Sequence, residues 1–279
     1  MKASAPRNGA GLGGSARRRP FRLPRWRERL TSVGVFVAIM TALEVLLPAL
    51  GVQAYIFPKP SAVAVAIGND LGNARFWGHA AITLREILIG CAAGSLIGFA
   101  LGVLLTQSAF AEAVITPYIV ALQAVPKVAL APLIVTLLGY GELSKVAIAA
   151  IISFFPLLVN VMLGIRGADE GQLELMRSLR ATRIQMLRWV QLPAALPAIF
   201  AGLEVAVVFS VVGAIVGEFT GASGGLGYLI EQRSFSLNQA AVFSTLIVLS
   251  VIGLVLDALV RGVAHRVVRW RSIGEVVGM

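Results

Sequence analysis

The chain has 279 residues, of which 57% are hydrophobic and only 14% are charged, and its mean hydropathy is +0.84. A soluble globular chain usually carries about 25% charged residues. The composition therefore excludes an ordinary soluble domain and predicts an integral membrane protein.

The net charge of +10 is distributed unevenly along the chain. Of the 24 Lys and Arg residues, nine lie between Lys2 and Arg29, five between Arg166 and Arg188, and four between Arg261 and Arg271. Basic clusters beside apolar spans are typical of cytoplasmic segments. This distribution argues against nucleic-acid binding and predicts that these three segments lie in the cytoplasm.

Residues 1–29 are rich in Gly, Ala and Arg. They are predicted to form a basic, disordered cytoplasmic tail, followed by a transmembrane domain over residues 30–279 with its core at 84–262. A signal peptide cleaved near residue 54 is the alternative. The apolar run that would form its core is longer than an ordinary signal core and contains Glu44.

Six apolar stretches have roughly the 20-residue length that a helix needs to cross a bilayer. The loops 51–83 and 218–240 carry few positive charges, so six spans place every basic segment inside, and five or seven would not. The fold class is therefore predicted to be all-α, with about six transmembrane helices and both termini cytoplasmic. The predicted spans are 33–50, 84–106, 112–139, 143–163, 194–217 and 241–262.

The only cysteine, Cys91, lies inside the second span, so no disulfide within the chain and no cysteine-based metal site is expected. The same span has glycines at every fourth position, which a helix places on one face. A face without side chains lets another helix approach closely. The glycines are Gly90, Gly94, Gly98 and Gly102.

The third span contains Pro117, Pro126 and Pro132, with Lys127 between the last two. Proline leaves carbonyl groups unpaired in a spanning helix, and broken helices often line the substrate path of transporters. Pro126, Lys127 and Pro132 are therefore candidates for the translocation path. The alternative is a kinked structural helix with Lys127 reaching towards an interface.

Ionisable residues within apolar spans are functional candidates by default. Glu204 is such a candidate for the translocation path, unless it is buried against a polar partner on a neighbouring span. Asp257 is one turn from Arg261, which favours a local ion pair.

The glycine-rich stretch 221–228 lacks the Gly-Lys-Ser/Thr ending of a phosphate-binding loop. It is predicted to form a tight re-entrant turn before a short helix.

Residues 164–193 form a polar, Arg-rich segment between two apolar spans. Asp169 and Glu170 suit the start of a helix over about 171–180, and a second amphipathic helix is expected over 182–191. Leu192 and Pro193 would then begin the fifth span. The segment is either an interfacial hairpin on anionic lipid or a docking element for a cytoplasmic protein. The residues expected to pack inwards are Met176, Leu179, Ile184, Leu187 and Val190.

This segment resembles the EAA loop of ABC-importer permeases, whose pattern is Glu-Ala-Ala, three residues, Gly, nine residues, Ile, one residue and Leu-Pro. Glu174, Val190 and Leu192-Pro193 match at the same spacing. Leu175 and Met176 replace the two alanines, and Arg180 replaces the glycine. The resemblance assigns ATPase coupling to Glu174, Arg177, Ser178, Arg180, Ala181, Leu192 and Pro193.

Further stretches resemble the nitrate, sulfonate and taurine branch of these permeases, so that the resemblance covers residues 57 to about 260. It implies the type I importer permease fold and a pathway for a small anion such as a sulfonate, taurine or nitrate. A thiamine-precursor-like organic molecule is the alternative cargo. The matching stretches are 57–63, 124–133, 139–145 and 217–228.

The resemblance also implies the partners. A second copy of the chain would complete the pathway in the inner membrane, and a periplasmic or lipid-anchored binding protein would deliver the cargo. A cytoplasmic ATPase dimer would bind ATP and Mg²⁺, so the chain itself is expected to have no cofactor, no metal and no catalytic residue. Two other classes stay open: a membrane-embedded enzyme using Glu204, and a scaffold that no longer transports because of the changes at Leu175, Met176 and Arg180.

Overall fold

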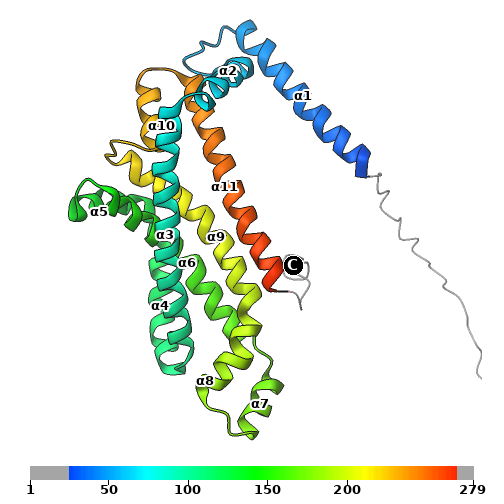
Figure 1. Cartoon of the computed structure of the whole chain (residues 1–279), viewed down its shortest axis with the longest axis vertical. Helices are drawn as coiled ribbons and strands as arrows, with labels where there is room; N and C mark the ends of the chain where they lie inside the picture. The colour runs from blue at the N-terminus through cyan, green and yellow to red at the C-terminus, as the bar shows by residue number, and fades with distance from the viewer. Residues whose placement is uncertain (1–24, 269–279) are drawn as a thin grey trace, which may run out of the picture.

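The computed structural model describes residues 25–268, in which every regular element is a helix. Its long helices run side by side in a bundle (Figure 1). Within the described residues, five helices are long and apolar enough to cross a membrane, or six if one bent pair counts as a single span. This confirms the predicted all-α membrane fold. The main helices are α3 (Ala74–Thr106), α4 (Ala109–Ala124), α6 (Glu142–Arg166), α9 (Leu192–Phe219) and α11 (Gln239–Val267).

The predicted tail 1–29 lies mostly outside the described residues, and α1 (Arg25–Ala49) begins within it. In Figure 1, α1 extends away from the bundle, and none of its membrane-spanning stretch is buried. The carboxylate of Glu44 accepts hydrogen bonds from the backbone N–H and the hydroxyl of Ser61, at 3.0 and 2.6 Å. Ser61 is in the first turn of α2 (Pro60–Leu71), so Glu44 occupies the positive end of that helix.

The third predicted span is broken at its prolines. After α4 comes the short 3₁₀ helix η1 (Lys127–Leu130), followed by α5 (Ala131–Leu138), and the two parts meet at an angle of 83°. Pro126 precedes η1 and Pro132 lies in the first turn of α5, whereas Pro117 is accommodated inside α4. Because proline cannot donate a helical hydrogen bond, the paired prolines end one helix and begin the next.

Helix α6 is the centre of the bundle, and its Ile148 and Val161 are fully buried. The glycine face of α3 packs directly on it. A methyl group added at Gly94 would lie 2.3 Å from the carbonyl oxygen of Ala150, and one at Gly90 would lie 2.5 Å from the Cβ of Ala149. These contacts confirm the predicted close approach, which in lipid supplies packing energy that the hydrophobic effect does not.

One end of the bundle, here called the loop end, carries α7 (Glu170–Ser178), α8 (Arg183–Met186) and the π-helical turn η2 (Leu187–Gln191). The opposite end, the far end, carries α2 and α10 (Leu226–Phe235). At the far end, Asp70 is buried and receives two hydrogen bonds from Arg233, at 2.8 and 2.5 Å. A third, from Ser244 on α11, measures 2.6 Å. Bidentate pairing of this kind joins α2 firmly to α10 and α11.

The glycine contact can be tested with a single methyl group. Gly94→Ala is expected to lower the free energy of unfolding by about 1–3 kcal/mol, because the new methyl meets backbone that cannot rotate away. Gly78→Ala is the matched control in the same helix, since no atom lies within 4 Å of its added methyl. Denaturant unfolding in detergent would measure both, and equal stabilities would contradict the packing role of this face.

Candidate functional site

Helix α7 begins where the sequence predicts. The side chain of Asp169 accepts a hydrogen bond from the backbone N–H of Gln172 at 2.9 Å and caps the helix. Three of the predicted coupling residues, Glu174, Arg177 and Ser178, lie on this short helix and are exposed. They are therefore presented together on a surface that projects from the loop end of the bundle (Figure 1).

The turn after α7 explains why the EAA motif has a glycine at the position of Arg180. Arg180 has a φ of 56°, in the left-handed region that favours glycine. The N–H of Arg180 donates to the carbonyl of Arg177 at 2.9 Å, and that of Ala181 donates to Met176 at 3.0 Å. This pair of bonds is a Schellman motif, whose left-handed position is usually glycine. Arg180 thus keeps the glycine conformation at a steric cost.

The second helix of the loop is joined to the bundle without a break. Thr182 and Gln185 form a reciprocal capping box at its start, with bonds of 2.7 and 3.3 Å. From Arg183 the helix continues to Phe219, a length of 37 residues. The prediction that Leu192-Pro193 begins the spanning helix is confirmed for α9, but α9 continues the loop helix rather than starting after a break. The N–H of Leu192 bonds to the carbonyl of Leu187, and this wider π turn accommodates Pro193, which has no N–H of its own.

The predicted inward packing of the loop is wrong for Leu179 and Ile184, which are 69% and 75% exposed. The loop extends past the end of the bundle (Figure 1), so none of the other helices within residues 25–268 covers them. Trp189, in the π turn, is also 67% exposed. Met176, Leu187 and Val190 are half-buried, as expected. The loop therefore presents an apolar surface among its arginines.

Two polar contacts join this region to α3 and α4. Arg166, at the end of α6, forms an ion pair with Glu112 in the first turn of α4. Arg183 donates to the carbonyl of Gln107, in the α3–α4 turn, at 3.4 Å. Movement of the loop would thus reach α4 as well as α9.

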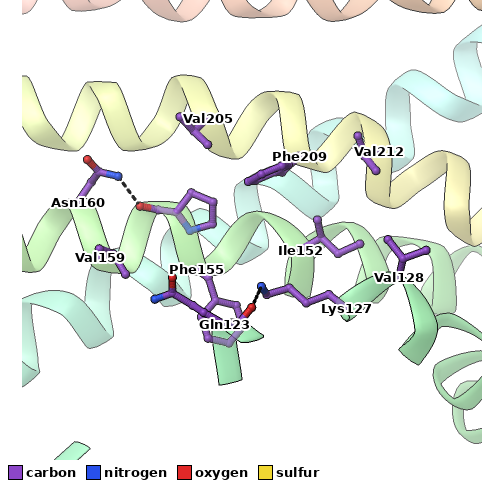
Figure 2. Close-up of a pocket in the computed structure, with 11 residues that line it drawn as sticks. Gln123, Lys127, Val128, Ile152, Phe155, Val159, Asn160, Val205, Phe209 and Val212 are labelled. Carbon is purple, nitrogen blue, oxygen red and sulfur yellow. Dashed lines mark hydrogen bonds between the residues drawn. The ribbon is translucent and has the colours of Figure 1, made fainter. Parts of the chain in front are cut away.

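A cavity of about 540 Å³ lies against the middle of α6 and α9, beside the break between α4 and η1 (Figure 2). Lys127 is half-buried in its wall. Its ammonium group donates to the carbonyl of Gln123 at 3.3 Å and lies 4.8 Å from the centre of the Phe155 ring. Of the predicted path residues, Lys127 is the one that the structure places in the cavity wall.

The other three path candidates lie elsewhere. Pro126 and Pro132 shape the break but do not line the cavity. Glu204 faces α11, where Arg261 approaches it to 3.9 Å. Arg261 also pairs with Asp257, which confirms the predicted local ion pair. Lys127 and Glu204 are therefore not brought together.

Sequence reasoning missed the other cavity residues. Asn160 and Phe209 line it from α6 and α9, but each lies in an ordinary apolar stretch. The amide of Asn160 donates to the carbonyl of Pro156 at 2.8 Å. A proline followed by an amide four residues later, inside a span, is the one local signal that pointed there.

A buried polar cluster at the far end was also missed. Glu86 and Glu218 are both fully buried, and Lys145 Nζ lies 3.1 Å from Glu86 Oε1. The Thr83 hydroxyl donates to Glu218 at 2.6 Å and accepts from the N–H of Leu226 at 2.7 Å. The cluster holds the predicted glycine-rich turn against α3.

The glycines of that turn are required by Glu218. A methyl group added at Gly225, which has a φ of 115°, would lie 2.2 Å from the carboxyl carbon of Glu218. One added at Gly227 would lie 2.7 Å from its Oε2. The short helix α10 follows directly. This agrees with the predicted tight turn before a short helix.

The left-handed conformation of Arg180 predicts the effect of restoring glycine. Arg180→Gly should stabilise the α7–α8 turn by roughly 1 kcal/mol, because it removes the steric cost of a side chain in this region. Arg177→Gly, inside α7, should destabilise it by a similar amount. Hydrogen exchange of the loop amides would report both, and slower exchange in Arg177→Gly than in Arg180→Gly would contradict the assignment.

Comparison with known proteins places this chain in a family. The model of the binding-protein-dependent transport system inner membrane component family matches residues 94–269. The formylaminopyrimidine transport permease of Halalkalibacterium halodurans is 32% identical over 85% of this chain and 94% of its own. A putative aliphatic sulfonates transport permease of Bacillus subtilis is 31% identical over 90% of each.

Other relatives are named for taurine transport in Escherichia coli and for nitrate import in Leptolyngbya laminosa. Among solved structures, an inward-facing MetNI methionine ABC transporter matches with a TM-score of 0.58 at 24% identity, over 67% of this chain and 92% of that one. This likeness supports the fold. The chain belongs to the family of binding-protein-dependent transport system inner membrane components, in the branch of importer permeases that includes those named for sulfonate, taurine and nitrate.

Proposed function

We propose that this importer permease couples ATP hydrolysis in a cytoplasmic ATPase dimer to transport through the loop at 164–193. Two copies of the chain form the pathway, and a solute-binding protein delivers the cargo at the far end. The loop end then faces the cytoplasm, and we assign both basic termini to the same side of the membrane from their charge. The partner ATPase binds ATP and Mg²⁺, and this chain forms the translocation pathway and undergoes the conformational change.

The observation that carries this proposal is the unbroken helix from Arg183 to Phe219. Its first turns belong to the loop, and its remainder crosses the bundle beside α6. A displacement of α8 is transmitted along the helix axis because helical backbone continues through the π turn that joins the two parts. An element of this kind suits alternating access, in which helices rock as rigid bodies around a central site.

The surface of the loop supports a protein partner over a lipid surface. Leu175, Leu179 and Ile184 are each more than 60% exposed on a segment that also exposes Glu174 and Arg177. Apolar anchors surrounded by charged groups are typical of protein interfaces. The loop also projects beyond the ends of the spanning helices (Figure 1) rather than lying flat against them.

The cargo we propose is a small anion, of the sulfonate, taurine or nitrate kind, with a pyrimidine-like organic molecule as the alternative. The cavity beside Lys127 supports an anion, because its wall carries a positive charge at mid-bundle depth. The membrane-enzyme alternative gains no comparable support, since Glu204 faces Arg261 rather than the cavity.

Coupling can be tested on the loop itself. Glu174→Ala and Arg177→Glu should lower uptake per ATP hydrolysed by about tenfold, the effect of losing one interface contact of roughly 1.4 kcal/mol. The chain should still insert and co-purify with its second copy, because these side chains are exposed. Uptake and ATP hydrolysis would be measured in proteoliposomes that contain the complete importer.

Glu231→Ala, which removes a carboxylate from α10 at the far end, is the control and should keep coupling intact. Normal coupling in both loop variants would contradict the docking assignment. Co-purification of the tagged chain from its membrane, with mass spectrometry of the bound proteins, tests the partners separately.

A further inference from the structure

We infer that the cavity beside Lys127 is a cargo site with a selectivity of its own: it accepts organic monoanions with an apolar body and disfavours small hydrated anions and zwitterions. This inference rests on the proposed transport function. It goes further because it assigns discrimination to the permease and not only to the binding protein.

The position of the cavity suits a cargo site. Its walls come from the middle of α6, over residues 152–160, and the middle of α9, over residues 205–212. The third side is the break between α4 and η1 (Figure 2). Transporter sites typically lie at the bilayer midplane beside discontinuous helices, and a volume of about 540 Å³ is within the range of small-molecule pockets.

The charge of the wall selects an anion. Lys127 is the one ionisable side chain among the 11 lining residues, and none of them is a carboxylate. An ammonium group has three protons, of which one is donated to Gln123, so others are available to an anionic head. The ammonium group of a zwitterion would find no carboxylate in this wall and would lose its hydration without replacement.

The rest of the wall selects an apolar body. Two amides, Gln123 and Asn160, are the other polar side chains of the lining. Where it rests against this wall, a small inorganic anion would exchange part of its hydration shell for hydrocarbon, which is unfavourable. An alkyl or aryl group would instead bury apolar surface, at about fourfold in affinity for each methylene. The apolar lining residues are Val128, Ile152, Phe155, Pro156, Val159, Val205, Phe209 and Val212.

The test uses the importer complex, permease with its ATPase, in lipid nanodiscs without the binding protein. Calorimetric titration would compare ethane-, butane- and hexanesulfonate, hexanoate, taurine and nitrate. Taurine is ethanesulfonate with one added amino group, so the two form a matched pair. The alkanesulfonates should bind about fourfold more tightly for each added methylene. Hexanoate, a carboxylate with an apolar body, should also bind. Taurine should bind at least roughly tenfold more weakly than ethanesulfonate.

Variants separate the two parts of the site. Lys127→Gln should weaken every organic anion by about tenfold or more, and Lys127→Arg should restore binding. Phe209→Ala should reduce the gain per methylene while leaving the contribution of the anionic head in place. Lys59→Gln, on the loop before α2, is the matched control and should change nothing. Because Lys127 also bonds the last turn of α4, co-purification with the ATPase confirms that each variant is assembled.

Taurine or nitrate binding as tightly as hexanesulfonate would overturn the inference, as would unchanged binding in Lys127→Gln. ATP-driven uptake of a neutral cargo that persists in Lys127→Gln would overturn the cargo class and leave the importer function standing. A permease that assembles with no ATPase would instead contradict the proposed function.

Discussion

Ala149 lies where three helices meet at backbone distance, and the rest of the structure depends on this contact. A methyl group added at Gly90 on α3 would lie 2.5 Å from its Cβ, and one added at Gly213 on α9 would lie 2.6 Å from its Cα. In a bilayer, apolar side chains gain little by leaving lipid, so helices associate through close packing of small residues. Glycine on both neighbours allows α6 to be enclosed from two sides.

This close packing allows a movement of the loop to be passed on to the helices of the bundle. Helices α6 and α9 are joined at the loop end by residues 167–191 and are held against each other along the bundle by glycine contacts, including that of Gly202 on Asn160. The helix from Arg183 to Phe219 therefore cannot tilt alone. A force applied to the loop moves α9 with α6, and the contacts of Arg166 and Arg183 extend that movement to α4.

The cavity exists because the span formed by α4, η1 and α5 is bent and does not pack along α6 and α9 as a straight helix. The prolines at 126 and 132 turn the chain by 83° between α4 and α5, so no straight helix covers the middle of α6 and α9 on that side. The exposed carbonyls left by the break are partly satisfied by Lys127. The same feature thus opens a space and places a positive charge in its wall. At the far end, by contrast, Glu218 and Asp70 bind the turn and α10 to α3, α2 and α11.

The sequence by itself determined the membrane class, the approximate positions of the apolar helices, the glycine face, the proline break and the loop motif, because each is a local pattern of hydropathy, spacing or backbone preference. Even the unusual Arg180 was marked by sequence, since it occupies the glycine position of a motif whose turn needs a positive φ. Only the tertiary structure decided which polar groups meet. Glu86 with Lys145, Asp70 with Arg233, and Glu204 with Arg261 join residues of different helices. It also decided that Lys127 lines a cavity and Glu204 does not, because the rotation of each helix about its axis is set by its neighbours and not by its own residues.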